Sequence, residues 1–146
     1  MKVYLDNCCY NRPYDDQTQT RISLETQAKL QIQSMVRNHE LELVSSYVLM
    51  YENSKNPYKM RRNAIKSFIK EHTSIYIDID CGNAVKVLAD EIISTGVKTA
   101  DAYHVACAIL AGSDCFLTTD NRLLKYRTDK IMMMNPTEFI RQWEEP

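Results

Sequence analysis

The sequence predicts an α/β protein, a three-layer α/β/α sandwich with a mainly parallel central sheet. Short apolar runs, typical of buried strands, recur along the chain. Between them lie longer segments whose apolar residues repeat with the helical period of about 3.6 residues. Only 3 Gly and 4 Pro are spread over 146 residues, so few residues interrupt this alternation. Strands that alternate with helices form parallel sheets with helices on both faces.

The first half of the chain is expected to contribute two strands and three helices. The strands cover residues 2–6 and 41–45, and an amphipathic helix over residues 21–37 joins them. Ser45 or Ser46 is expected to cap a helix over residues 47–53, because serine oxygens accept hydrogen bonds from the first free N–H groups. The third helix is expected to open at Pro57 and to turn these residues inward: Met60, Ala64, Phe68 and Ile69.

The second half repeats the alternation. Gly96 is expected to end one helix and Thr99 to cap the next, which runs to Gly112. Pro136 is expected to begin a closing helix, because proline suits the first helical position. The remaining predicted elements are a strand over 75–77, a helix before Gly96, a strand over 115–118, a short helix over 120–126 and a strand over 131–134.

Length and composition narrow the class of protein. A chain of this length fits one domain, residues 1–146, with a sizeable core. No apolar run reaches the length of a membrane span, and no signal peptide is expected, so the protein is predicted to be cytoplasmic, with no membrane partner. The five cysteines are odd in number and lack a CxxC pair, so they are expected to be structural thiols.

Four acidic residues are candidates for chemistry: Asp6, Glu52, Asp101 and Asp120. Each aspartate alone has an ordinary structural interpretation. Asp6 can form a turn after a strand, Asp120 can cap a helix, and Asp101 suits the first turn of one. Glu52 lacks such an interpretation, because a carboxylate among apolar neighbours is unusual unless it is paired or coordinated.

The position of all four acids favours a shared site. Asp6 and Asp120 follow predicted strands, and sites in open parallel sheets form beyond the carboxyl ends, where the strand order reverses. Asp101 and Glu52 are expected to reach the same edge from helices. Four carboxylates in one cleft repel one another unless a cation neutralises them. All-oxygen ligands select Mg²⁺ or Mn²⁺, and one or two such ions typically act on phosphodiesters.

Four short segments also carry a family resemblance: LDN at 5–7, YE at 51–52, KTADAYHVACA at 98–108 and LTTDNR at 117–122. With these segments in this order, the chain resembles the PIN-domain ribonucleases over essentially its whole length. It is most similar to their single-domain VapC-like branch, the toxins of toxin–antitoxin pairs. The resemblance implies a PIN-like fold, a metal-dependent endoribonuclease that acts on RNA, an antitoxin partner and a homodimer.

The resemblance also implies roles for single residues. The catalytic, metal-binding set would be Asp6, Glu52, Asp101 and Asp120. Thr118 matches a hydroxyl that supports the site, and His104 matches a histidine that orients a neighbour without binding metal. Asn7 departs from the Ser or Thr that the family commonly has there, but it can still donate a hydrogen bond to a carboxylate. The polar segment 11–16 matches no part of the pattern.

A basic stripe allows two interpretations. It consists of Lys59, Arg62, Lys66 and Lys70, at helical spacing. The stripe is either a solvated helix face or a contact with the RNA backbone. The net charge of −1 decides neither, because a local basic stripe matters more for nucleic-acid binding than the whole-chain sum.

Two other functions lack the residues that they need in this sequence, and a third stays as an alternative. An aspartyl phosphotransferase needs two aspartates at i and i+2 after the first strand, but Asn7 and Cys8 follow Asp6. A nucleotide-binding module needs a glycine-rich phosphate loop, and this chain has too few glycines for one. The alternative that remains is a PIN-like module that binds RNA or protein and cleaves nothing.

Overall fold

One fully parallel sheet forms the centre of the computed structural model, which describes residues 1–145. Its spatial order is β3-β2-β1-β4-β5, so the strand order reverses between β1 and β4. The strands, in chain order, are β1 (Lys2–Leu5), β2 (Glu42–Ser46), β3 (Thr73–Ile77), β4 (Cys115–Leu117) and β5 (Met132–Met134). The predicted parallel sheet is therefore confirmed.

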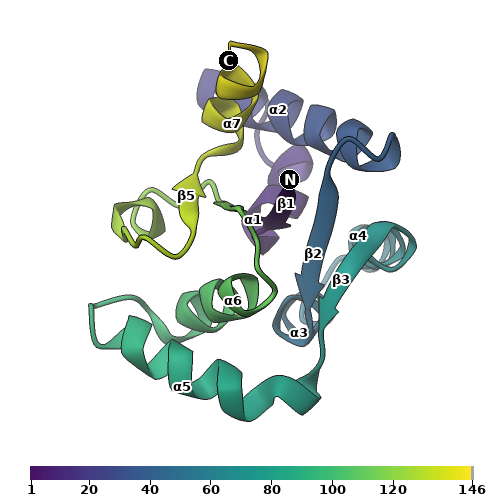
Figure 1. The fold of residues 1–146 in the computed structure, drawn as a ribbon. Helices are drawn as coiled ribbons and strands as arrows, with labels where there is room; N and C mark the ends of the chain where they lie inside the picture. Colours follow the sequence, from purple (N-terminus) through teal and green to yellow (C-terminus); the bar gives the residue numbers. More distant parts are fainter. Residues whose placement is uncertain (146) are drawn as a thin grey trace.

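Helices cover both faces of this sheet, which gives the predicted three layers. In Figure 1, α2 and α7 lie on one side of it and α5 and α6 on the other. The helices are α1 (Asn7–Asn11), α2 (Thr20–Arg37), α3 (Tyr47–Ser54), α4 (Lys59–His72), α5 (Gly82–Ile93), α6 (Thr99–Leu110) and α7 (Pro136–Glu144). Single 3₁₀ turns, η1 (Arg12–Tyr14), η2 (Ile79–Cys81) and η3 (Leu123–Lys125), complete the described part of the chain.

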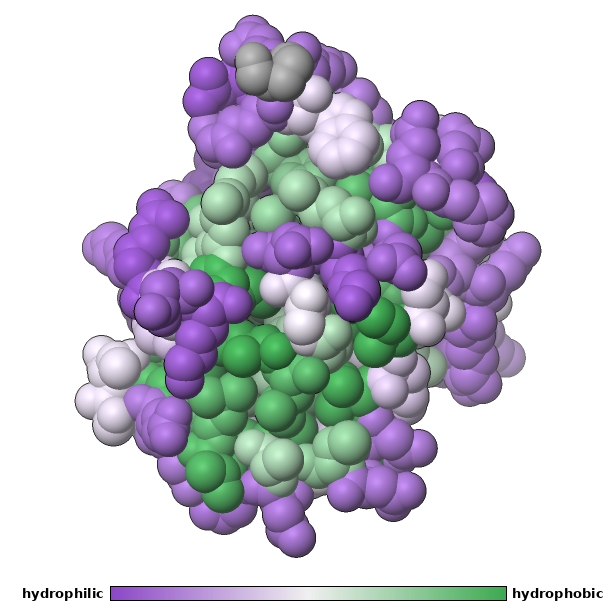
Figure 2. Space-filling view, viewed as in Figure 1, coloured by the Kyte–Doolittle hydropathy of each residue, from purple (hydrophilic) through white to green (hydrophobic). Residues whose placement is uncertain are grey.

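The core lies between the layers. Residues Val3, Tyr4 and Leu5 of the central strand are fully buried, as expected for a strand with neighbours on both sides and helices on both faces. No helix within residues 1–145 has both the length and the apolar character to cross a membrane. Figure 2 shows apolar residues gathered on the surface over α5 and α6, where Val87 and Leu110 are exposed.

Several expected elements differ in detail. Helix α4 begins at Lys59, so the prediction that Pro57 opens it was wrong. Met60 in the first turn is 87% exposed, and the buried residues are Ile65, Phe68 and Ile69. The predicted helix over 120–126 is only the single turn η3, and α6 begins after an extended Lys98 with no side-chain cap.

Segment 7–16, of which residues 11–16 match no part of the family pattern, is ordered by its own hydrogen bonds. Asp6 caps α1 through the Asn7 N–H at 2.8 Å. Arg12 of η1 donates from Nε to Oε1 of Glu25 on α2 at 2.9 Å, and the Glu25 side chain is only 2% exposed. The segment is therefore fastened to α2 by a buried ion pair.

Glu25 also joins three distant parts of the chain. Its Oε2 accepts hydrogen bonds from Arg21 Nε at 3.1 Å and from Asn135 Nδ2. The other end of Arg21 donates from Nη2 to the Thr119 carbonyl oxygen at 2.6 Å. Since Thr119 directly precedes Asp120, this buried carboxylate holds the segment that follows β4 in place.

Candidate metal centre

Asp6 lies where the strand order reverses. It follows β1, the strand shared by the two halves of the sheet, and its backbone N–H donates to the Leu117 carbonyl of β4 at 2.9 Å. Its side chain is 6% exposed and accepts from the Asn7 N–H and from Thr118 Oγ1, each at 2.8 Å. The partly buried thiol of Cys8 lies 3.5 Å from Asp6 Oδ2, the oxygen that also accepts from Thr118. Uncharged donors therefore hold this carboxylate in one orientation.

Glu52 reaches the same edge from α3. Its Oε1 accepts from Asn7 Nδ2 at 3.2 Å, and its Oε2 is hydrogen-bonded to Nε2 of His104. The hydrogen bond to His104 lowers the pKa of Glu52 and outweighs the opposing effect of burial. Asn7 thus connects Asp6 with Glu52. Its predicted role as a residue that supports the site stays a prediction.

Asp101 is in the first turn of α6. This helix runs directly into β4, so its N-terminus lies at the carboxyl edge of the sheet. The pKa of Asp101 is raised, first by burial and then by the negative charges of Asp6 and Asp120, with a smaller contribution from Glu52. The four predicted acids are therefore close enough in space to influence one another's charge.

Asp120 is the outermost of the four. It follows β4 and is exposed, and its Oδ1 accepts from the backbone N–H groups of Arg122 at 2.8 Å and Leu123 at 3.4 Å. Its own N–H donates to Thr118 Oγ1 at 3.1 Å, and Thr118 in turn donates to Asp6. Thr118 therefore links the outer aspartate to the buried one, and its supporting role in the site stays a prediction.

His104 is held by a chain of buried polar side chains that the sequence did not reveal. Its Nδ1 is 2.8 Å from the hydroxyl of Tyr4 on β1, and that hydroxyl is 2.7 Å from Ser46 Oγ, the cap of α3. Burial lowers the pKa of His104, but the hydrogen bond to Glu52 and the nearby carboxylates raise it by more. The ring therefore contacts Glu52 from a fixed position, and its role in orienting that carboxylate stays a prediction.

The donor set suits a hard divalent cation. The only cationic partner of these acids within residues 1–145 is His104, since no Lys or Arg forms an ion pair with any of the four. Neighbouring carboxylates that repel one another and have no Lys or Arg as an ion-pair partner favour a bound cation, and oxygen ligands favour Mg²⁺ or Mn²⁺. Within the described residues, no three His, Cys, Asp or Glu side chains lie close enough together to coordinate one metal ion. The four acids are therefore neighbours, but they are not arranged as a complete coordination shell.

The basic stripe is placed apart from the acids. Lys59, Lys66 and Lys70 are exposed on α4, whereas Arg62 is partly buried and donates from Nη1 to the Asn56 carbonyl oxygen at 2.8 Å. Arg62, Lys66 and Lys70 line a groove against α3 that contains none of the four acids. Its role in RNA binding stays a prediction.

Comparison with known proteins identifies structural relatives only. No protein-family model matches this sequence, and no curated protein matches it. Among solved structures, VapBC2 from Rickettsia felis matches at a TM-score of 0.56 and 16% identity, over 92% of this chain and 98% of that one. In that structure, VapBC2 is bound to a DNA fragment from its own promoter. FitAcB from Neisseria gonorrhoeae matches at the same TM-score and identity, over 92% and 97%. This likeness confirms the predicted PIN-like α/β/α fold.

Proposed function

We propose that this protein is a divalent-metal-dependent endoribonuclease that hydrolyses RNA phosphodiester bonds and acts as the toxin of a toxin–antitoxin pair. One observation carries the proposal: four carboxylates from four separate segments lie near one another at the carboxyl edge of a parallel sheet, and none of them forms an ion pair with a Lys or Arg in residues 1–145. Such an arrangement is costly unless a cation is bound, and it lies where α/β proteins bind their ligands.

Asp6, Glu52, Asp101 and Asp120 would hold one or two Mg²⁺ or Mn²⁺ ions. A bound ion of this kind neutralises developing charge on a phosphate and activates water for in-line attack. The protein contributes orientation. Asn7 and Thr118 fix the carboxylate of Asp6, and Asn7 also fixes that of Glu52.

His104 has a positioning role in this proposal. It contacts Glu52 on one side and Tyr4 on the other, so Glu52 is held from the sheet through a buried ring. Outer partners of this kind raise metal affinity by holding a ligand in its binding orientation. Each of the four acids keeps unused lone pairs for a cation, since a carboxylate accepts about four hydrogen bonds.

The fold supports a protein partner. The two structural relatives are toxin–antitoxin complexes, and one of them is bound to promoter DNA. By analogy, an antitoxin would cover the acidic centre of this chain. A homodimer is also part of the proposal, supported by the apolar surface over α5 and α6. Action on cellular RNA would place the protein in the cytoplasm.

A module that binds RNA without cleaving it remains the second candidate. It is favoured by the hydrogen bonds that Asp120 makes to the N–H groups of Arg122 and Leu123, because these give Asp120 a structural role of its own. The first candidate is favoured by the closeness of Asp6, Asp120 and Glu52 to Asp101, since their negative charges add to the effect of burial in raising the pKa of Asp101. Cleavage separates the two.

The first prediction is that Asp101→Asn lowers cleavage of a labelled RNA in Mn²⁺ or Mg²⁺ by roughly 10³-fold, because several kcal/mol of charge stabilisation go with the ligand. Asp129→Asn removes the same charge from an exposed residue outside the centre and serves as the matched control. Wild-type protein in EDTA should be as inactive as the variant. Full activity of Asp101→Asn, or cleavage that persists in EDTA, would contradict the proposal.

A further inference from the structure

Two pockets flank the carboxylate centre, and each includes residues of it. The first, the Tyr126 pocket, is a cavity of about 470 Å³ between the turn before α6 and the segment after β4. It is lined by Asp101 and by Lys98, Arg122, Lys125, Tyr126 and Arg127, among others. The second, the Tyr58 pocket, measures about 310 Å³ and includes Asn7 and Glu52, together with Asn56, Tyr58 and Arg61. Both volumes fall within the range of roughly 300–1,000 Å³ that is usual for ligand clefts.

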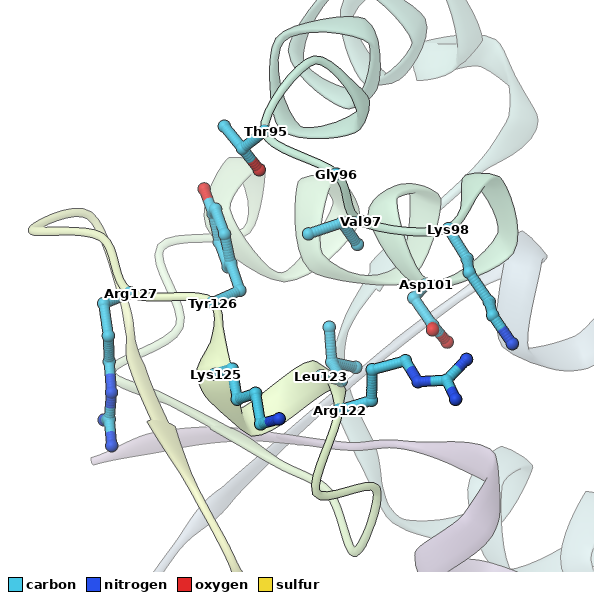
Figure 3. Close-up of a pocket in the computed structure, with 10 residues that line it drawn as sticks. All are labelled: Thr95, Gly96, Val97, Lys98, Asp101, Arg122, Leu123, Lys125, Tyr126 and Arg127. Carbon is cyan, nitrogen blue, oxygen red and sulfur yellow. The ribbon is translucent and has the colours of Figure 1, made fainter.

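The Tyr126 pocket carries unpaired positive charge. Lys98, Arg122, Lys125 and Arg127 form no ion pair with any carboxylate in residues 1–145. Figure 3 shows the end groups of Lys98 and Arg122 close to the carboxylate of Asp101 at one end of the pocket, while the ring of Tyr126 stands toward Thr95 at the other. A ligand with a phosphate near Asp101 and a flat ring near Tyr126 fits this distribution.

The Tyr58 pocket presents aromatic rings and cations together. The guanidinium of Arg61 lies over two rings, 4.0 Å from the centroid of Tyr58 and 4.9 Å from that of Tyr14. Tyr58 is 57% exposed, so much of its surface is left open to a ligand. Exposed tyrosines next to Arg and Lys are typical of surfaces on which nucleic-acid bases stack.

Amide side chains tie this pocket to the metal centre. Asn56 Nδ2 donates to Asn11 Oδ1 at 3.0 Å, and Asn11 Nδ2 donates to Asn7 Oδ1 at 3.2 Å. Asn7 then donates to Glu52. This chain of hydrogen bonds fixes the pocket relative to the carboxylates, so a nucleotide in the Tyr58 pocket would be held at a constant distance from the centre.

We infer that the two nucleotides flanking the cleaved bond of the RNA place their bases in separate pockets, one in the Tyr126 pocket and one in the Tyr58 pocket, on either side of the carboxylate centre. This inference rests on the proposed function for the position of the cleaved bond. Lys98 and Arg122 neutralise a phosphate beside the centre, and the two tyrosines receive the flanking bases. A duplex does not fit, because paired bases cannot be turned out into two separate pockets.

The test measures binding apart from cleavage. Fluorescence anisotropy follows a labelled single-stranded RNA of about ten nucleotides on the full chain in EDTA, where no cleavage is expected. Tyr126→Leu and Tyr58→Leu keep an apolar side chain but remove the ring, and each should weaken binding about tenfold, the usual scale for one stacked base. Tyr76→Leu, at an exposed tyrosine in neither pocket, should change the dissociation constant less than twofold.

Charge and strandedness give two further readouts. Lys98→Ala with Arg122→Ala should flatten the dependence of log K on log salt by about 0.7 for each lost phosphate contact. Lys86→Ala with Lys130→Ala removes the same charge outside both pockets and should leave that slope unchanged. A duplex of the same sequence should bind about tenfold more weakly than the single strand.

The outcomes distinguish this inference from the proposed function. Wild-type affinity in both tyrosine variants, or equal affinity for duplex and single strand, would overturn the inference even if metal-dependent cleavage is found, and would leave the pockets to a protein partner. Weakened binding in those variants, together with no cleavage in any metal, would support the strand path and overturn the nuclease.

Discussion

The buried acid Glu25 and the four acids at the sheet edge differ in how their negative charge is neutralised. Glu25 is enclosed by Arg12, Arg21 and Asn135, so the protein supplies its own positive charge. The acids of the proposed metal centre are held by uncharged donors and one histidine, and none of them forms an ion pair with a Lys or Arg in residues 1–145. Glu25 thus has basic partners within ion-pair distance, whereas the acids at the sheet edge do not, although Lys98 and Arg122 point toward Asp101, and an external cation is proposed there.

The largest expected effect is at Glu25. Glu25→Ala leaves Arg12 with a side chain only 17% exposed and without its main partner, so the free energy of unfolding should fall by about 3 kcal/mol. Urea unfolding measures the change. Glu138→Ala breaks an exposed ion pair with Arg141 and should cost less than about 0.5 kcal/mol. Equal losses in the two variants would show that the buried acid is not held as described.

Added metal should act on the other group alone. Mn²⁺ at about one hundred times its dissociation constant should raise the free energy of unfolding of the wild type by ~2.7 kcal/mol, since it binds only the folded state. Thermal unfolding with and without Mn²⁺ checks this. Asp101→Asn should lose most of the gain, whereas Glu25→Gln should keep it. If Mn²⁺ raised the free energy of unfolding of Asp101→Asn by the same amount, Asp101 would not be a metal ligand.

Lys29 is a buried cation, and it contrasts with the buried acid Glu25. Its side chain is 6% exposed, it lies 5.7 Å from the ring centroid of Tyr10, and no carboxylate in residues 1–145 pairs with it. Burial lowers the pKa of Lys29 to about 8. Between that value and the ordinary pKa of about 10.5, the unfolded chain binds more protons than the folded one, so the cost of burying Lys29 decreases as the pH rises through this window.

Lys29→Met should therefore raise the free energy of unfolding at pH 7 by roughly 2 kcal/mol. This advantage should shrink as the pH approaches 10, where the folded wild type already carries a neutral amine. Urea unfolding at pH 7, 8.5 and 9.5 measures the difference between the two proteins. A difference that stays constant across these pH values would show that the charge of Lys29 is not the cause.

The smallest effect has the opposite sign from that at Glu25. In EDTA, Asp101→Asn should unfold at a slightly higher temperature than the wild type, by the equivalent of under ~1 kcal/mol, because one of four mutually repelling charges is gone. Differential scanning calorimetry resolves such a shift. Asp129→Asn is again the control and should not raise the melting temperature. A marked loss of stability in Asp101→Asn would mean that Asp101 is a structural acid like Glu25.

Much of the fold was predictable because each strand is a local signal. Buried strands such as 3–5 and 115–117 read directly as apolar runs, and Pro136 begins the last helix as predicted. The placement of Asp6 and Asp120 at one edge of the sheet could be expected as well, because strand ends in a parallel sheet share an edge, whereas the role of the four acids as metal ligands stays a prediction. Ser46 caps α3 with its side chain, one of the two serines proposed for that position.

The rest depends on contacts that a local pattern does not contain. Helix α1 has five residues, too few for a helical period, and it forms because Asp6 caps it. Met60 matched the apolar period, yet α4 begins only one residue before it, and the side chain projects into solvent. Tyr4 looked like an ordinary core residue, since its partner His104 is 100 positions away. Lys98, Asp101 and Arg122 stood within segments already singled out, KTADAYHVACA and LTTDNR, but no local pattern showed that they line one pocket.

The reversal of strand order has a consequence for how the protein is made. The opening strand occupies the middle of the sheet, and one of its two neighbours, β4, is 112 residues later in the chain. A nascent polypeptide still attached to the ribosome therefore holds its first aspartate without the threonine that orients it or the outer aspartate beside it. Contacts between such distant segments also form slowly. If the centre cuts RNA, it cannot be assembled before the segment that follows β4 has left the ribosome.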